Sequence, residues 1–283
     1  GMAELARSFK TTFNIAIAPS IFFAHSTIER LATHLQDEHG STLTRPATVQ
    51  ATPPKPQAFA VDEAISPKDD PIAIIGMSGR FPGARNINEM WRILEQGSNT
   101  VTEIASDRFD WRDIYGGPQA GEGKSVSKWG GYLPGIREFD PLFFQIAPRE
   151  ATSMDPRQRL LLQESWKALE DAGQGPHLLK KNKVGVFVGA EEGDYGRIAP
   201  GLGVTSNHNG ILASRLSYFL DLEGPAIAIN TACSSGLVAM HQACASLRAG
   251  DCSMAIAAAA NLILTPEPYV GMSRAGMLSS DGK

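Results

Sequence analysis

An apolar run passes directly into an amphipathic one between Gly224 and Gly250, and this junction most constrains the fold. Residues 226–230 follow a Gly-Pro turn and are short, apolar and partly β-branched, which predicts a buried strand. Apolar residues then recur at helical spacing up to Gly250, which is typical of a helix end: Leu237, Met240, Ala243, Cys244 and Leu247. The chain is therefore predicted to turn from strand to helix at Cys233, which would open the helix.

The same alternation of strands and helices extends over most of residues 70–260. We predict strands at 71–76, 183–189, 226–230 and 253–260, and helices at 88–96, 155–172 and 209–220. In the helix at 88–96, Met90, Trp91 and Leu94 are expected to face inward. The strands are apolar on both faces, as in sheets that helices cover on both sides, so we expect an α/β layered fold.

The bulk composition excludes several classes of protein. The chain has 283 residues, 42% of them hydrophobic, which suffices for a substantial core. The net charge is −4 and the basic residues are scattered, so no nucleic-acid partner is expected. The longest apolar stretch, near 254–264, is too short to cross a bilayer. Three cysteines without a C-x-x-C pair indicate neither a zinc site nor a redox pair, and with no signal-like N-terminus they favour a cytoplasmic location.

Residues 1–39 have the pattern of a small helical piece. A capping box at residues 26–29 and an apolar stripe after it predict a helix over about 27–36. About 39 residues bury too little surface to fold alone, so we expect this piece to be the end of a longer domain. Residues 40–69 are rich in Pro, Ala and Thr and are expected to form a semi-extended linker. A second domain is expected from residue 70.

Cys233 has two interpretations on this pattern. At a helix start, unpaired N–H groups stabilise a thiolate, and the small residues around Cys233 let an acyl group approach the backbone, which suits acyl transfer. Cysteine is also among the most buried residue types, and most cysteines are inert core residues. Both interpretations remain open from the pattern, whereas Cys244 and Cys252 are expected to pack in the core.

Six ordered motifs between residues 70 and 283 resemble the β-ketoacyl synthase family, specifically the ketosynthase domains of modular polyketide synthases. The motifs lie at residues 70–83, 139–144, 154–170, 213–219, 231–235 and 276–279, and the fifth of them is Thr231-Ala-Cys-Ser-Ser235. The resemblance implies a thiolase-like layered αβαβα fold, of which residues 70–283 are the N-terminal half, and a homodimer. Two departures bear on substrate preference, because Asn230 stands where the family commonly has Asp and Gly236 where Ser is common.

By this resemblance, Cys233 is the catalytic nucleophile of an acyltransferase of the β-ketoacyl-carrier-protein synthase type. Its thiol would accept an acyl chain from a carrier-protein thioester, with its backbone N–H as an oxyanion donor, before decarboxylative Claisen condensation with a malonyl-type extender. The ketosynthase itself would bind no cofactor or metal. The family's two catalytic histidines, its supporting lysine and its second oxyanion donor would lie beyond Lys283.

Residues 1–39 resemble the end of a truncated acyl carrier domain. The serine that carries phosphopantetheine would then precede Gly1. Residues 207–210 and 258–261 resemble systems whose acyltransferase acts in trans. Two alternatives to an elongating ketosynthase remain: a non-elongating domain that only transfers acyl groups, or a carrier and docking fragment that is catalytically inert when isolated.

Four other polar groups have predicted roles. His208 is a candidate substrate contact in the acyl channel, although a loop histidine in a polar cluster is more often structural. Asp155 is predicted to cap a helix, and Arg157 and Arg159 to pair locally or at an interface. Glu191, Glu192 and Asp194 are interpreted as a solvated acidic loop.

Overall fold

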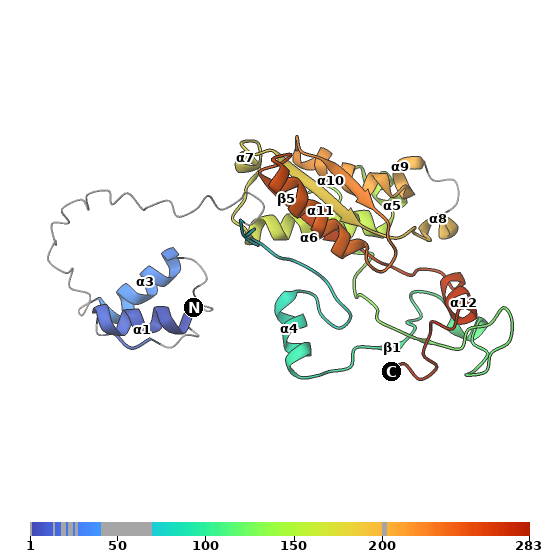
Figure 1. Ribbon diagram of the computed structural model, residues 1–283. Helices are drawn as coiled ribbons and strands as arrows, with labels where there is room; N and C mark the ends of the chain where they lie inside the picture. The colour runs from blue at the N-terminus through green and yellow to red at the C-terminus, as the bar shows by residue number, and fades with distance from the viewer. Residues whose placement is uncertain are drawn as a thin grey trace. The chain divides into compact units, whose positions relative to one another are not determined.

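Figure 1 shows the computed structural model, which describes residues 2–13, 15–17, 21, 25, 28–40, 70–199 and 203–283. The chain divides into two compact units, residues 1–64 and residues 65–283. The expected capping residues 26–27 and the expected linker, apart from Gly40, lie outside the described residues.

The first unit contains two amphipathic helices. Helix α1 spans Met2–Phe13 and α3 spans Ile28–His39, three residues longer at its end than the sequence predicts. A small apolar cluster lies in this unit, and its buried members are Ala6, Ile15, Ile17 and Leu35. The hydrophobic spacing that predicted the second helix is therefore confirmed by a buried side chain, Leu35, on its apolar side.

The core of the second unit is a parallel sheet that, within the described residues, has three strands in the order β4-β3-β5. Strand β3 spans Val184–Gly189, β4 Ala226–Ile229 and β5 Met254–Ala259. Every residue of β3 is buried, because parallel strands pair with both of its edges and helices cover both of its faces. The predicted strands at 183–189, 226–230 and 253–260 are confirmed to within one residue at each end.

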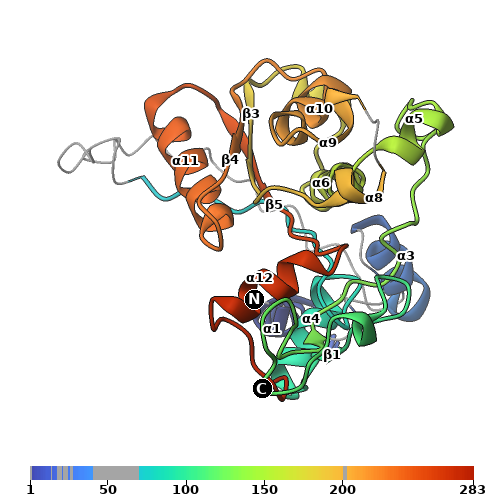
Figure 2. The same cartoon turned by 90° about the vertical axis from the view of Figure 1, so that its right-hand side faces the viewer.

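Helices cover both faces of this sheet. Helix α6 (Pro156–Asp171) and α10 (Gly210–Leu220) share a core with Val184, Val186 and Val188 of β3. Helix α11 (Ser235–Ala249) instead packs on Phe187, whose side chain points to the opposite face because side chains alternate along a strand. Figure 2 shows α11 on one side of the strands and α10 with α6 on the other. The predicted helix–sheet–helix layering is confirmed.

The predicted strand at 71–76 is not a strand in the structure. It pairs with no other strand among the described residues, and Ile74 and Ile75 are 72% and 52% exposed. Its far end is nevertheless fixed, because the Met77 N–H donates to the Asp171 carboxylate at 2.9 Å. An apolar run becomes a strand only when a neighbour supplies hydrogen bonds, and here no neighbour does.

The predicted helix at 88–96 is present as α4 (Ile87–Glu95), but its apolar side is not buried as predicted. Trp91 and Leu94 are 60% and 58% exposed, and Met90 is half-buried. Local contacts stabilise the helix instead: Asn86 caps its N-terminus and the Trp91 indole donates to Glu95.

The remaining elements are short. Two antiparallel strands, β1 (Thr102–Glu103) and β2 (Trp129–Gly130), lie close to α12 (Glu267–Arg274), because the Tyr269 hydroxyl donates to the Trp129 carbonyl at 3.0 Å. The others are η1 (Trp111–Asp113), α5 (Pro148–Ser153), α7 (Pro176–Leu179), α8 (Tyr195–Ile198) and α9 (Val204–Asn207).

Candidate active site

Cys233 lies at the edge of the sheet where the parallel strands end. Strands β3, β4 and β5 run in the same direction, so their carboxyl ends meet at one edge, where α/β proteins commonly bind ligands. Cys233 follows the last residue of β4 by four positions, and it is exposed. Cys252 is buried against Phe187, as predicted for a core residue, whereas Cys244 is only half-buried. An exposed thiol at this edge is open to an acyl donor.

The residues before Cys233 form a sharp turn that side chains hold in place. The Ala232 N–H donates to the Asn230 side chain at 3.1 Å, and the Thr231 N–H donates to the Ser235 hydroxyl at 2.9 Å. Ala232 has a φ of 55°, in the left-handed region that costs a residue with a Cβ about 1–2 kcal/mol. This strain at a strand-to-helix turn presents the next residue, Cys233, to solvent.

The prediction that Cys233 opens the helix is wrong by two positions. Helix α11 begins at Ser235, with Ser234 as the preceding cap residue, so Cys233 lies in the turn before the first helical residue. Cys233 and Ser234 belong to the turn, because the Ser235 N–H and hydroxyl both donate to the Ala232 carbonyl. The role of the Cys233 backbone N–H as an oxyanion donor stays a prediction.

The end of β3 is packed directly against this turn. A Cβ on Gly189 would lie 2.4 Å from the carbonyl carbon of Ser235, so only glycine fits there without a backbone shift. The next residue, Ala190, donates its N–H to the Ile229 carbonyl at 3.0 Å. The segment that leaves β3 and the turn that carries Cys233 are therefore adjacent.

Residues 190–194, which we call the central loop, directly follow β3. A buried ion pair packs against this loop and fixes it. Arg157 and Asp155 pair at 2.8 Å, with side chains 3% and 2% exposed. Arg157 also donates to the Glu191 carbonyl, and Asn209 donates to the same oxygen at 3.1 Å. Asp155 accepts from the Arg157 N–H, which confirms it as a helix cap. Arg157 pairs locally, as predicted, but it is buried rather than at the surface.

Asp194, at the end of the central loop, is not solvated as predicted. It is 9% exposed, and its Oδ2 accepts from the N–H groups of Leu264 and Thr265 at 2.8 and 2.9 Å, and from the Thr265 hydroxyl at 3.1 Å. The carboxylate therefore joins the loop after β3 to the segment after β5. The partners are about 70 residues apart in sequence, so no local pattern could reveal this contact.

His208 lies two residues before α10 and is exposed. Its Nδ1 accepts from the Gly210 N–H at 3.0 Å, a local contact that helps to fix the helix entry. None of the contacts found among the described residues joins His208 to Cys233. Its role as a substrate contact stays a prediction, and its hydrogen bond supports the structural alternative.

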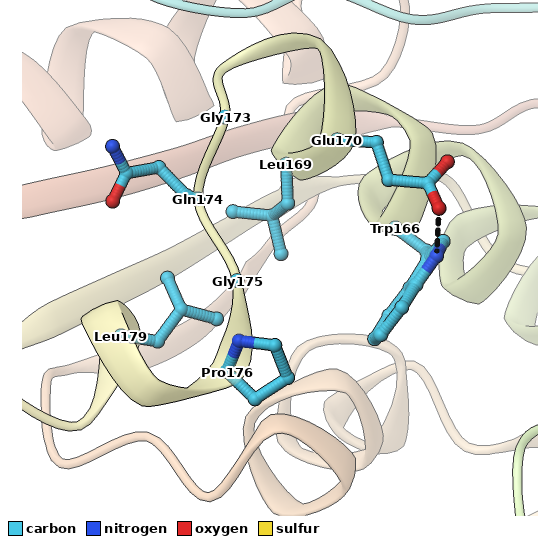
Figure 3. A pocket seen from close by; sticks show the side chains of 8 residues that line it. All are labelled: Trp166, Leu169, Glu170, Gly173, Gln174, Gly175, Pro176 and Leu179. Carbon is cyan, nitrogen blue, oxygen red and sulfur yellow. Dashed lines mark hydrogen bonds between the residues drawn. The ribbon is translucent and has the colours of Figure 1, made fainter.

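Figure 3 shows an apolar pocket of about 130 Å³ in a different part of this unit. Trp166 and Leu169 of α6 and Pro176 and Leu179 of α7 line it, and the Trp166 indole donates to Glu170 at 2.7 Å. Since α7 lies just before β3, the pocket is near the amino end of that strand. No cysteine, serine, threonine or lysine lines it, so it does not compete with Cys233 as a centre for acyl transfer.

In the part of the chain that the structure describes, no helix is long and apolar enough to cross a membrane. The same residues include no group of three or more His, Cys, Asp or Glu side chains placed to hold a metal ion.

Comparison with protein families places most of the chain in one family. The sequence pattern described as "Beta-ketoacyl synthase, N-terminal domain" matches residues 69–283. Polyketide synthase PksM of Bacillus subtilis is 40% identical over 297 residues, which cover 100% of this chain and 7% of that protein. Erythronolide synthase EryA3 of Saccharopolyspora erythraea is 40% identical over 291 residues, covering 99% of this chain and 9% of the synthase. The chain thus spans less than a tenth of these two relatives.

Solved structures with the same fold are ketosynthase domains. The oxazolomycin ketosynthase domain OzmH KS7 of Streptomyces albus is 42% identical, with a TM-score of 0.71 over 76% of this chain and 38% of that one. The ketosynthase from module 6 of the bacillaene synthase of Bacillus subtilis is 43% identical, with a TM-score of 0.68 over 76% of this chain and 36% of that one. The thiolase-like fold expected for the second domain is confirmed, and the carrier bundle expected before it stays a prediction.

Proposed function

This chain belongs to the β-ketoacyl synthase family, and we propose that its Cys233 thiol accepts an acyl chain from a carrier-protein phosphopantetheine thioester. The observation that carries the proposal is the exposed thiol on a strained turn at the carboxyl ends of the strands. Such a turn keeps a nucleophile accessible while the sheet behind it stays rigid, which covalent catalysis requires.

The acyl-transfer step follows from thioester chemistry. The Cys233 sulfur attacks the thioester carbonyl and forms a new carbon–sulfur bond, and a tetrahedral intermediate bears the negative charge on oxygen. Backbone N–H groups, including that of Cys233, stabilise this oxyanion. The bond to the phosphopantetheine sulfur then breaks, and the leaving sulfur takes up the proton that Cys233 lost. The products are an acyl-cysteine and a free phosphopantetheine thiol, so atoms and charge balance.

In the full-length synthase, the acyl-cysteine is then elongated. A malonyl-type extender loses CO₂, its carbanion attacks the acyl carbonyl, and a carbon–carbon bond forms as the Cys233 sulfur leaves. The family's histidines, which the resemblance places beyond Lys283, would assist this second step. Since the chain covers 38% of the solved oxazolomycin ketosynthase, we expect the isolated chain to be inactive. A domain that transfers acyl groups without elongating them is the alternative.

Mapping of the acylated residue tests the proposal. Full-length synthase is incubated with an acyl-pantetheine thioester, and the peptide that carries the added acyl mass is identified by mass spectrometry. We expect the mass on Cys233, its loss in Cys233→Ala and its retention in the matched control Cys244→Ala. Acylation that persists in Cys233→Ala would refute the assignment. Addition of a malonyl carrier thioester then separates the two alternatives, because only an elongating domain releases a β-ketoacyl product.

A homodimer is the expected assembly, and an exposed apolar face supports it. Leu237 and Met240 of α11 are 74% and 51% exposed, and Ile227 of the neighbouring strand β4 is 43% exposed. Exposed apolar side chains on neighbouring elements are typical of an interaction surface. We expect Leu237→Asp with Met240→Asp to convert a dimer of the full-length synthase to monomers in light scattering, whereas Tyr218→Asp, exposed on α10, tests whether the effect is specific to α11.

The other expected partners, a carrier domain and a trans-acting acyltransferase, are inferred from the resemblances of residues 1–39, 207–210 and 258–261. Residues 1–39 are proposed to be the end of an acyl carrier domain that residues 40–69 tether to the ketosynthase. A tether of this length keeps the carrier at high effective concentration near Cys233. We also propose a cytoplasmic synthase that is served by a trans-acting acyltransferase, which mass analysis of carriers loaded by an added acyltransferase would test.

A further inference from the structure

The order of the strands places the central loop between the two segments that border the site. Strand β3 lies between β4, which leads to Cys233, and β5, which leads to Leu264 and Thr265. A thioester bound at the carboxyl ends of the strands therefore lies beside residues 190–194. Any contact that fixes this loop also fixes the segments that follow β4 and β5 relative to each other.

Asp194 provides such a contact on the β5 side. Its Oδ2 accepts three hydrogen bonds from Leu264 and Thr265, at 2.8, 2.9 and 3.1 Å. Charge-assisted hydrogen bonds of this kind are about twice as strong as neutral ones, and three donors on one oxygen fix both the distance and the direction of the β5 exit.

Arg157 provides a contact on the other side of the same loop. A Cβ on Gly193 would lie 2.1 Å from the Arg157 Nη2 and 2.7 Å from the Asp155 Oδ2, so the loop backbone packs directly on the buried ion pair. The loop is thus held at Glu191 and Gly193 from α6 and at Asp194 from the β5 exit.

The two carboxylate oxygens of Asp194 differ in their surroundings. Its second oxygen, Oδ1, is buried and has no hydrogen-bond partner among the described residues. A buried carboxylate oxygen without a donor costs free energy, but Oδ2 satisfies three donors that an apolar side chain would leave without an acceptor. The carboxylate gains directional contacts in return, which indicates a requirement for geometry at this point.

We propose that Asp194 is a positioning residue for acyl transfer. It holds the exits of β3 and β5 at a fixed separation beside Cys233, and it thereby aligns the bound thioester carbonyl with the thiol without changing the reactivity of the thiol. The proposal rests on the function proposed for Cys233. Its consequence is that loss of the three hydrogen bonds lowers the rate of the acylation step and leaves the access of small reagents to Cys233 unchanged.

Two substitutions of Asp194 separate positioning from folding. Asp194→Asn keeps an oxygen for the three donors and supplies an N–H₂ group where Oδ1 is unpaired, whereas Asp194→Ala removes every acceptor. Each is made in the full-length synthase, together with Glu223→Ala, which removes an exposed carboxylate and serves as the matched control. Acylation by an acyl-pantetheine thioester gives kcat and KM, and alkylation of Cys233 by iodoacetamide reports thiol reactivity.

We expect Asp194→Ala to lower the kcat of acylation by about tenfold or more, since small misplacements of reacting groups have effects of that size. KM and the alkylation rate should stay within about twofold of the wild type. Asp194→Asn and Glu223→Ala should retain most of the wild-type kcat. If Asp194→Ala does not fold, Thr265→Val serves instead: it removes one of the three hydrogen bonds and should lower kcat about two- to fivefold with alkylation unchanged.

An equal loss of acylation and alkylation would show a structural role and overturn the proposal, as would an unchanged kcat in Asp194→Ala, or in Thr265→Val where that variant is used. Loss of kcat in Asp194→Asn equal to that in Asp194→Ala would also overturn it. A wild-type synthase that is not acylated at Cys233 would refute the proposed function itself, an outcome that the wild-type measurement distinguishes before any variant is compared.

Discussion

Strand β3 and residues 71–76 have nearly the same sequence pattern and different structures. Both are short apolar runs that end at a glycine, Gly189 and Gly76. Each residue of β3 is buried between two parallel strands, whereas residues 71–76 are exposed or half-buried and pair with no strand among the described residues. An apolar pattern therefore specifies that a segment should be buried, and its neighbours decide whether it becomes a strand.

The two segments are alike at their ends. A Cβ on Gly189 would lie 2.4 Å from the Ser235 carbonyl carbon, and a Cβ on Gly76 would lie 2.2 Å from the Ala168 carbonyl oxygen. Each glycine thus permits a close approach to a helix. Residues 71–76 are fixed at one end to α6 and lack only a strand to pair with, which fits a segment whose partner lies elsewhere in a larger ketosynthase domain.

Truncation of one buried side chain in β3 and one exposed side chain in residues 71–76 should give the largest difference in the free energy of unfolding. Phe187→Ala should lower the free energy of unfolding of this chain by about 3–5 kcal/mol, because Phe187 is 1% exposed and packs on α11. Ile75→Ala should change it by less than about 0.5 kcal/mol, since Ile75 is 52% exposed. Urea denaturation measures both values. Equal losses would mean that residues 71–76 are packed as β3 is.

Hydrogen exchange tests directly whether residues 72–75 pair with a further strand in the full-length synthase. In this chain, the amides of residues 72–75 should exchange at close to the unfolded rate, while those of 185–188 are protected by their ladder. In the full-length synthase, pairing of residues 72–75 with a further strand should slow their exchange by about a hundredfold or more. Mass spectrometry of peptic peptides resolves the two segments. Unchanged exchange at 72–75 in the full-length protein would show that the segment has no strand partner there either.

Local patterns in the sequence predicted β3, β4, β5, α6 and α10, because hydrophobic spacing and glycine or proline boundaries are local signals. They failed for residues 71–76, where the outcome depends on a distant partner. At the candidate site, the place of Cys233 between a strand and a helix was predictable, but the strained turn at Ala232 moved the helix start by two residues. The contact of Arg157 with Glu191 and the contacts of Asp194 were missed because these partners lie 34 to 71 residues away.

Glu164 on α6 fixes the chain just after residues 71–76, and its effect should depend on pH. Its carboxylate accepts from Ser78, from Arg80 at 2.8 Å and from Lys167 at 2.8 Å. Burial opposes ionisation, but the hydrogen bonds from Lys167, Ser78 and Arg80 outweigh it and hold the pKa of Glu164 below its usual value of 4.5. A lowered carboxyl pKa stabilises the fold above the unfolded value, and this contribution is lost as pH falls through the folded value.

We therefore expect Glu164→Gln to lower the free energy of unfolding by about 1–2 kcal/mol at pH 7, and the difference from the wild type to shrink below about pH 4.5. Glu122→Gln, in an exposed loop, is the matched control and should have little effect at either pH. Urea titrations at pH 7 and pH 4 measure the two differences. A difference that is independent of pH would show that Glu164 acts through packing and not through its charge.

The smallest expected effect concerns strain in the turn beside Cys233. Ala232 has a φ of 55°, so Ala232→Gly should relieve about 1–2 kcal/mol of backbone strain. Glycine also gains about 0.5–1 kcal/mol of conformational freedom in the unfolded chain, which leaves a net stabilisation of about 0–1.5 kcal/mol. Ala190→Gly, at a buried residue outside the left-handed region, should instead destabilise the chain. Urea denaturation distinguishes the signs, and a destabilised Ala232→Gly would mean that the turn before Cys233 stores no strain and is held by its side-chain hydrogen bonds.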